Sequence, residues 1–113
     1  MTAFSPKFFA DGELPTVQAA IFVASADVGS YVKSFSLYNK NAATQTITLW
    51  IKRVNGSGTA RFFQRYELLV DEYATVIDED LQSLELEPGD EIQAATTTAN
   101  AVDFDISGVQ EIN

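Results

Sequence analysis

The chain of 113 residues contains neither cysteine nor histidine. Without cysteine, no disulfide and no thiolate metal site can stabilise the fold. Nucleophilic triads and the common zinc sites are also excluded, because they depend on histidine or cysteine. No stretch approaches the roughly 18 uninterrupted apolar residues of a membrane helix, and the N-terminus lacks the basic-then-apolar order of a signal peptide. We therefore expect an unprocessed, soluble protein with no cofactor and no membrane partner, stabilised by packing or by self-association.

Basic residues are absent from the C-terminal part of the chain, which holds most of the acidic ones. Residues 1–65 carry seven basic and three acidic residues, whereas residues 66–113 carry thirteen acidic residues and no basic one, and the net charge is −9. A negative surface repels phosphate backbones, so we expect no nucleic-acid partner. The segregation also allows a head-to-tail contact between the basic region of one copy and the acidic region of the next. Simple solubility is the alternative explanation.

Short strand-like segments separated by turn residues fill the chain beyond Thr16. In residues 45–54 and 102–108, apolar and polar side chains alternate with period two. Residues 55–59 suit a hairpin turn, and Pro88-Gly89 fits a type II turn. We expect an all-β fold, a jelly-roll-like β-sandwich of about eight short antiparallel strands. The expected strands are residues 17–24, 31–39, 45–54, 60–70, 73–77, 84–86, 91–97 and 101–111.

We predict one domain, with an irregular N-terminal arm over residues 1–16 and the β-sandwich over residues 17–113. The arm mixes three phenylalanines with turn-forming residues and shows no clean period. Because free apolar rings are costly in water, Phe4, Phe8 and Phe9 should lie either on the domain's own surface or on a neighbouring subunit. We predict that they form an interface, and that removal of the arm leaves a folded domain.

No residue pattern indicates catalysis, and we predict that the protein is not an enzyme. A carboxylate-dependent glycosidase is the weak alternative, because Asp103 and Asp105 share one strand face. The acidic segment 78–80 offers the oxygen ligands that calcium prefers, although its spacing matches no EF-hand loop. We expect neither a catalytic site nor a metal site.

Trp50 is the aromatic residue most suited to a ligand or a partner. By strand alternation it lies on the polar side of residues 45–54, where an indole can stack on a sugar ring or anchor a protein interface. Within one subunit, a neighbour such as Tyr38 or Phe63 could instead cover it.

Several segments of the chain resemble small virion structural proteins of tailed bacteriophages, namely Gly12–Pro15, Tyr31–Asn39, Gln45–Leu49, Leu86–Asp90 and Val102–Val109. The resemblance implies a compact β-sandwich present in many copies on a virion, as a capsid decoration protein or as a neck or tail component. Decoration proteins of this size are often trimers seated on the shell. The resemblance assigns no functional residue individually.

Our leading hypothesis is therefore a capsid decoration or cement protein that is assembled into virions in the host cytoplasm. Its partners would be further copies of itself, as a homotrimer, and the major capsid protein or another virion protein. A neck, tail or fibre component that binds a carbohydrate receptor is the alternative. Many weak contacts acting together would supply the affinity for an acidic capsid. The predicted docking surface consists of the basic residues Lys33, Lys40, Lys52, Arg53, Arg61 and Arg65.

Overall fold

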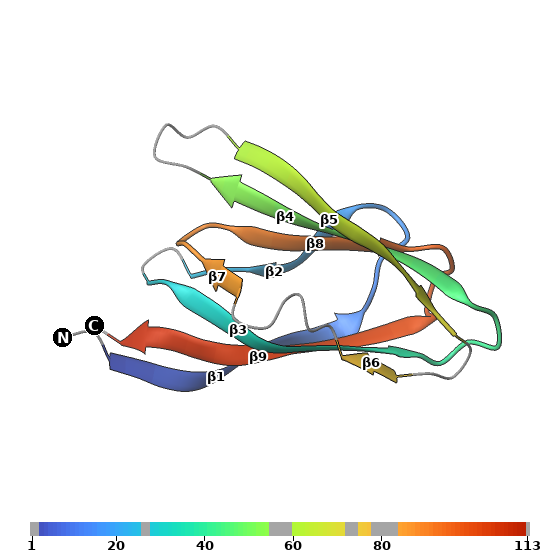
Figure 1. Ribbon diagram of the computed structural model, residues 1–113, viewed down its shortest axis with the longest axis horizontal. Coiled ribbons are helices and arrows are strands. Elements are labelled where there is room, and N and C mark those ends of the chain that lie inside the picture. The colour runs from blue at the N-terminus through green and yellow to red at the C-terminus, as the bar shows by residue number, and fades with distance from the viewer. Residues whose placement is uncertain (1–2, 26–27, 55–59, 72–74, 78–83, 113) are drawn as a thin grey trace.

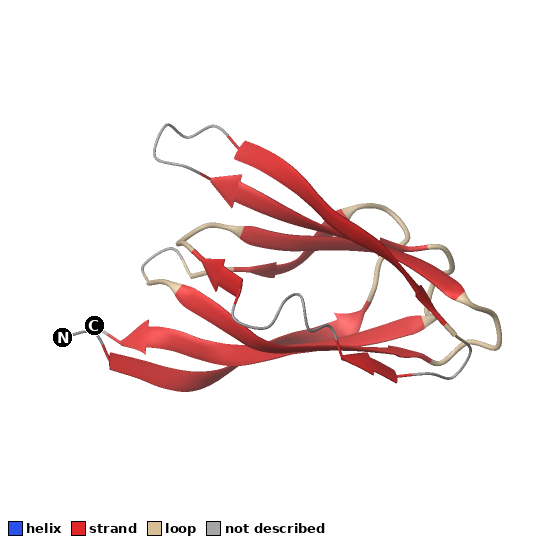
Figure 2. Cartoon of the chain, viewed as in Figure 1, coloured by secondary structure: helices blue, strands red, loops and turns tan. Residues whose placement is uncertain are grey.

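The computed structural model describes residues 3–25, 28–54, 60–71, 75–77 and 84–112, and it describes the backbone alone at residues 3, 54, 60–69, 75–77 and 112. In this part of the chain all regular structure is β (Figure 2). No helix among these residues is long and apolar enough to cross a membrane. The strands are β1 (Ala3–Glu13), β2 (Ala19–Val23), β3 (Ser30–Asn39), β4 (Gln45–Val54), β5 (Ala60–Val70), β6 (Thr75–Ile77), β7 (Leu84–Leu86), β8 (Glu91–Thr96) and β9 (Val102–Ile112).

The strands form two antiparallel sheets that pack face to face (Figure 1). Sheet A has the order β1-β9-β3-β6, and sheet B has the order β2-β8-β4-β5. Two short strands share the last position of sheet A, because β6 pairs with one end of β3 and β7 pairs with the other. Among the described strands, sheet A therefore has four positions across its width, the last of them divided between β6 and β7, and sheet B also has four.

The pairing of the strands is nested around the connection between β4 and β5. β4 pairs with β5, β3 with β6 and β7, β2 with β8, and β1 with β9. Successive pairs fall in opposite sheets, as if one long hairpin had been rolled up. The pairs β3·β9 and β4·β8 then join the rolled turns side by side. This connectivity is the jelly roll, so the predicted fold class is confirmed.

The core lies between the two sheets and follows from the period-two alternation of the strands. In β4, Ile47, Leu49 and Ile51 are fully buried, and in β9 Val102 and Ile106 face them from the other sheet. Each fully buried side chain of this size stabilises the fold by about 1.5 to 3 kcal/mol. The alternation that predicted these two strands therefore also identifies their buried faces.

The prediction of an irregular N-terminal arm was wrong for residues 3–13, which form β1. This strand pairs with β9 from Ala3 opposite Ile112 to Glu13 opposite Asp103. β1 is thus an edge strand of sheet A. Proline is tolerated in an edge strand because it has no N–H to donate, and at the edge no neighbouring strand needs that hydrogen bond. The register shifts between Phe8 and Ala10, so a bulge interrupts the alternation that would have indicated a strand.

The predicted Pro88-Gly89 turn is present between β7 and β8. Gly89 has φ of 88°, and the N–H of Asp90 donates to the carbonyl of Glu87 at 3.0 Å. A positive φ at the third residue is the type II arrangement that glycine favours. The buried Asp90 carboxylate accepts a bond from the Glu87 N–H and lies 2.8 Å from Arg53 Nη1, so it connects this turn to β4.

Candidate interaction surface

The outer face of sheet A, on β1, β9 and β3, carries exposed aromatic and acidic side chains. On β9 the inward positions are Val102, Phe104 and Ile106, so the odd-numbered residues from Asp103 onward point outward. Directly opposite residues in antiparallel strands share a face, which places the register partners of those residues on the same surface. These partners come from β1 and β3.

Two exposed phenylalanines lie toward the end of this face where the chain termini meet. Phe4 is 49% exposed and Phe8 is 57% exposed. The Phe4 ring meets the Tyr31 ring edge-on, with centroids 5.4 Å apart and planes at 80°. Partial burial, followed by the charges of Glu85 and Glu111, raises the pKa of Tyr31 above its ordinary value. Phe4 and Phe8 therefore lie at the surface of the subunit, and their part in an interface stays a prediction.

Phe9 behaves differently from the two other phenylalanines. The bulge turns its ring toward the core, where it stacks on Phe22 of β2 with centroids 4.8 Å apart and planes at 21°. Phe9 thus packs between the two sheets of one subunit. Its contacts are those of a residue that stabilises the fold.

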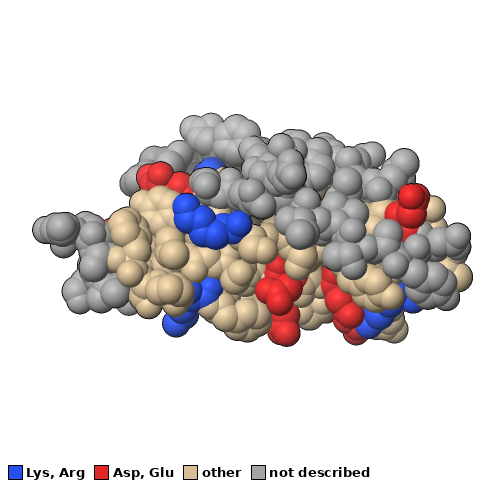
Figure 3. Space-filling view, turned by 60° about the horizontal axis from the view of Figure 1, so that its bottom comes forward, with Lys and Arg blue, Asp and Glu red and all other residues tan. Residues whose placement is uncertain are grey.

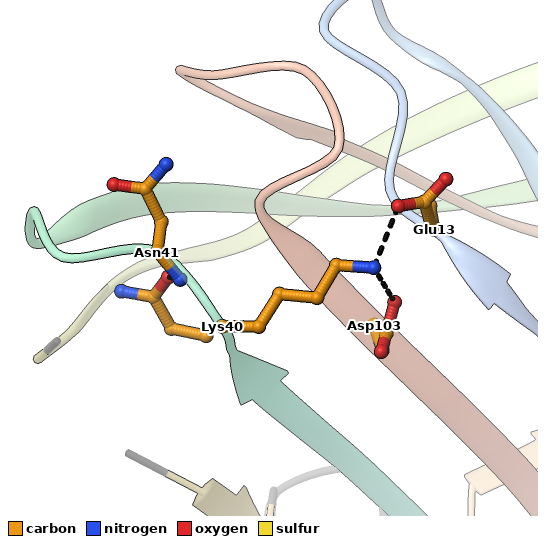
Figure 4. Close-up of polar contacts among 5 residues, drawn as sticks. Glu13, Lys40, Asn41 and Asp103 are labelled. Atoms are coloured by element: carbon orange, nitrogen blue, oxygen red, sulfur yellow. Dashed lines mark hydrogen bonds and ion pairs between the residues drawn. The ribbon is translucent and has the colours of Figure 1, made fainter. Parts of the chain in front are cut away.

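The other end of the outer face is acidic. Asp11 of β1 lies directly opposite Asp105 of β9, and Glu13 lies directly opposite Asp103. Lys40 bridges the second pair, with its Nζ 2.7 Å from Glu13 and 3.0 Å from Asp103 (Figure 4). The hydrogen bond to Glu13, followed by the one to Asp103, raises the pKa of Lys40 above its ordinary value.

A shallow depression of about 430 Å³ lies at this acidic end. Side chains and backbone of β1, β3 and β9 line it, and the lining residues include Asp11, Glu13, Ser36, Tyr38, Asp103 and Asp105. Tyr38 is partly exposed, so the depression offers one aromatic ring among carboxylates. Figure 3, which brings the sheet A side forward, shows acidic side chains mainly from the middle of the surface to the right and basic ones mainly to the left.

The two carboxylates considered for glycoside hydrolysis have different surroundings. Asp103 is held by Lys40, and Asp105 is exposed on a sheet face. Among the residues that the structure describes, no three of the types His, Cys, Asp and Glu are grouped to hold a metal ion. The acidic segment 78–80 considered for calcium lies outside the described residues.

Of the six basic residues predicted as one docking surface, the four whose side chains the structure describes are divided between the two sheets. Lys33 and Lys40 belong to sheet A and its margin, whereas Lys52 and Arg53 belong to β4 of sheet B. Lys52 pairs with Glu91 at 3.7 Å, Arg53 pairs with Asp90 at 2.8 Å, and Lys40 is paired as described above. The side chains of Arg61 and Arg65 on β5 lie outside the described residues.

Trp50 lies on the outer face of sheet B and is partly buried. Its register partners are Gln93 on β8 and Gln64 on β5. Phe63 pairs instead with Ile51, and Tyr38 belongs to the other sheet, so neither is its cross-strand partner. The orientation predicted for Trp50 by strand alternation agrees with this position.

Sequence reasoning missed that Asp11, Glu13, Tyr31 and Tyr38 share the outer face with Phe4 and Phe8. Only the pairing of β1 with β9 and of β9 with β3 places them together. The available signal was the period-two series Phe4, Pro6 and Phe8, which is interrupted by the bulge.

The comparisons with known proteins concern the fold. No protein-family model and no curated protein matches the chain. A chain from the T13 particle of infectious bursal disease virus has a TM-score of 0.60 and 7% identity, over 99% of this chain and 31% of the viral chain. A chain from the Gx strain of that virus has a TM-score of 0.54 and 10% identity, over 98% of this chain and 32% of the other.

A subunit of the disulfide-linked pili of Bacillus endospores also matches, with a TM-score of 0.44 and 12% identity over 97% of this chain and 85% of the pilus chain. The present chain thus spans about a third of the length of the viral chains that it matches. At these identities the likeness is one of fold. The two viral neighbours support a sandwich of the kind found in virus particles, and the resemblance to tailed-phage proteins stays a prediction.

Proposed function

We propose that the chain is a non-enzymatic structural subunit of a virion, and that it decorates the outer shell of a tailed-bacteriophage capsid as a homo-oligomer. The supporting observation is that the rolled-hairpin jelly roll uses strands from both ends of the chain, and that the same fold occurs in a virus-particle chain over 99% of this one. Jelly rolls are a common architecture of capsid domains. A trimer is the assembly that the resemblance to decoration proteins implies.

The outer face of sheet A adds a second argument for a role in assembly. Phe4 and Phe8 are both about half exposed and lie on the same face. A group of exposed large apolar side chains on one face of a protein often marks a surface that contacts another molecule. An exposed face of this kind suits the recognition of another macromolecule.

The test is the composition of particles from the virus that encodes this chain. Density-gradient-purified particles should contain the protein in many copies by quantitative mass spectrometry, and immunogold should label the capsid shell. Labelling confined to the neck or tail would support the alternative location instead. Absence from purified particles would overturn the proposal.

Trp50 allows the carbohydrate-binding alternative to be tested directly. It is the single tryptophan, it is partly buried, and it lies on the outer face of sheet B. A sugar ring stacked on it would change its fluorescence. We expect no saturable change on titration with host surface polysaccharides, and a saturable change that Trp50→Ala abolishes would favour a receptor-binding tail component.

A further inference from the structure

The strand β2 is an open edge of sheet B. It is the outermost strand on one side of the sheet, and among the described strands only β8 pairs with it (Figure 1). Just after β2, the N–H of Ala24 donates to the carbonyl of Asp90, and the carbonyl of Ala24 accepts a bond from the N–H of Gly89. Because successive residues of a strand turn these groups to opposite edges, the N–H and the carbonyl of Val23 point away from β8. The edge therefore presents a backbone donor and acceptor to a further strand.

This edge is also apolar and uncharged. Residues 14–26 form the longest segment of the chain without a charged residue. Ala19 and Ala20 are exposed, Val23 is 53% exposed, and Val17, just before the strand, is 74% exposed. An exposed apolar edge is a template on which another strand can pair. Since the net charge of −9 makes two copies repel each other, an uncharged segment is where they can approach with the least opposition.

The other edges of the two sheets carry features by which natural proteins prevent edge-to-edge pairing. β1 contains Pro6, which has no N–H, and its ladder is interrupted by a bulge. β6 and β7 have only three residues each. The sequence of β5 includes Arg61, Arg65 and Glu67. β2 contains neither a proline nor a charged residue.

From these observations we propose that two copies of the chain pair through β2 in antiparallel fashion, so that sheet B continues as one eight-stranded sheet across the dimer. A two-fold axis perpendicular to the sheet relates the copies, and the same edge serves both of them. This inference rests on the self-association in the proposed function, and it names the contact through which two copies meet.

The two faces of β2 determine the register of this pairing. The register of β2 on β8 shifts between Ala20 and Phe22, so Ile21 is an extra residue, and both Ile21 and Phe22 pack against the core. Ala20 and Val23 then lie on the outer face of sheet B, opposite outward-facing residues of β8. Because opposite residues of antiparallel strands share a face, Ala20 of one copy lies opposite Val23 of the other. The extra residue of each copy lies near the two-fold axis.

This register suits the side chains that it brings together. The exposed side chain of Val23 comes to lie beside Ala20 of the second copy, where a single methyl group leaves room for it. The two-fold axis repeats this contact. A second copy of β2 thus matches the edge in its backbone groups, in the direction of its faces and in the size of its side chains, which identifies it as the occupant.

The small size of the contact sets its expected strength. β2 has five residues, so the paired edge is about 17 Å long. We expect a weak dimer with a dissociation constant above about 1 µM, because so short an edge buries less than the roughly 1,200 Å² of most stable interfaces. Raising NaCl to about 1 M should preserve or strengthen the dimer, since backbone bonds and apolar contacts hold it and salt screens the repulsion between two acidic copies.

Disulfide trapping tests the register, because the natural chain has no cysteine. One variant carries Ala20→Cys and the other carries Val23→Cys. Mixed under oxidising conditions, they should form a covalent heterodimer, since opposite residues lie within the span of a disulfide. Each variant alone should crosslink at least about tenfold less, because its two cysteines are offset by three residues, or about 10 Å along the strands. Non-reducing electrophoresis and mass spectrometry measure the products.

A control and a second measurement keep the test specific. Ala42→Cys, in the exposed connection between β3 and β4, gives the background when it is mixed with Val23→Cys. In sedimentation velocity over about 10 to 500 µM protein, Val23→Glu should weaken dimerisation at least about tenfold, because it places a charge on the paired edge. Ala42→Glu changes the net charge equally and should leave dimerisation as in the parent. Circular dichroism would establish that each variant is folded.

Three outcomes would overturn the pairing through β2. They are a parent protein that is monomeric at every concentration, a mixture of the two cysteine variants that crosslinks no more than the background, and a dimer that Val23→Glu leaves unchanged. These measurements use the purified protein in solution and do not depend on whether it is found on virions. Failure here is therefore distinguishable from failure of the proposed function.

Discussion

At the scale of single residues, the end of the sandwich between β3 and β4 depends on Asn39. The Nδ2 group of this buried side chain donates hydrogen bonds to the carbonyl of Val70 at 3.0 Å and to that of Ala43 at 2.9 Å. Its Oδ1 accepts a hydrogen bond from the N–H of Asn41. Buried polar groups of this kind are costly once their partners are removed. One side chain thereby ties the turn after β3 to the end of β5.

Asn39→Ala should lower the free energy of unfolding by about 1 to 3 kcal/mol, because the carbonyl of Val70 loses a buried donor. Urea denaturation followed by tryptophan fluorescence would measure the change. Asn41→Ala is the matched control, since the Asn41 side chain accepts only an exposed bond from the N–H of Ala43 and its loss should cost less than about 1 kcal/mol. Equal effects of the two substitutions would contradict this account of Asn39.

Lys40 makes the stability of the protein depend on pH in the alkaline range. Its pKa is raised above the ordinary value of 10.5, first by the hydrogen bond to Glu13 and then by that to Asp103. The folded protein therefore holds this proton more tightly than the unfolded chain does. The stabilisation is fully present below the unfolded pKa and is lost as the pH rises through the folded one.

Urea titrations at about pH 8 and about pH 11 should show a larger loss of stability for the parent than for Lys40→Met, because only the parent has this proton to lose. Lys33→Met removes an exposed lysine of β3, the strand that precedes Lys40, and should behave like the parent. If Lys40→Met loses as much stability as the parent on going to high pH, the ion pair has no such role.

At the scale of elements, the bulge in β1 decides which of two adjacent phenylalanines supports the fold. Phe9 stacks on Phe22 and packs against the core, whereas Phe8 is 57% exposed. Phe9→Ala should destabilise the protein by about 2 to 4 kcal/mol, because it leaves a cavity between the sheets. Phe8→Ala should change stability by no more than about 0.5 kcal/mol. Paired thermal and urea melts would measure both, and similar values would mean that the bulge is placed elsewhere.

The position of β1 reverses the expectation that the N-terminal segment can be removed without loss of the fold. Deleting residues 1–16 takes away the strand that covers one edge of β9, and with it the side chains of Phe9 and Leu14. Burial of two such side chains is worth about 3 to 6 kcal/mol, which is comparable with the whole stability of a small domain. We expect the truncated chain to be unfolded or aggregated by circular dichroism and gel filtration, and a cooperative, native-like melt would refute this expectation.

The elements that the sequence predicted are those in which alternation is undisturbed. The expected strands at residues 45–54, 60–70 and 84–86 have the observed bounds, and most of the others differ by one or two residues at an end. β1 was missed because Pro6, Gly12 and the bulge at Phe9 break its period. In the candidate surface, the outward direction of Asp103 and Asp105 followed from alternation. Their neighbours could not be predicted, because they lie on β1 and β3, far away in the sequence.

At the scale of the whole molecule, the nested pairing brings basic residues of the first half of the sequence beside acidic residues of the second half. Strands from the N-terminal half lie beside strands from the C-terminal half, as β4 lies beside β8. Lys52 and Arg53 therefore meet Glu91 and Asp90 within one chain. These opposite charges of the two halves are therefore paired inside the subunit, whereas the head-to-tail contact between copies stays a prediction.

Nested pairing also requires contacts between residues far apart in the chain, with β1 against β9 the most extreme case. Sheets of this kind fold in milliseconds to seconds, because long loops must close before their contacts form. Stopped-flow refolding followed by the fluorescence of Trp50 should fall in that range. Joining the two ends with a short Gly-Ser linker should accelerate refolding, since the β1·β9 contact then becomes local. The linear chain carrying the same added residues is the control, and identical rates would show that this pairing is not limiting.

The antiparallel partnership of the first and last strands leaves Ala3 beside Ile112, and both ends of the chain leave the body at one corner (Figure 1). Any polypeptide attached at either end therefore departs from the same place, which suits grafting the whole body into a surface loop of another protein. Two fluorescent labels, one on each end, would report unfolding as a large change in energy transfer. A bulky cargo at that corner would also stand next to Phe4, so the choice of fusion site would itself influence what the outer face of sheet A can contact.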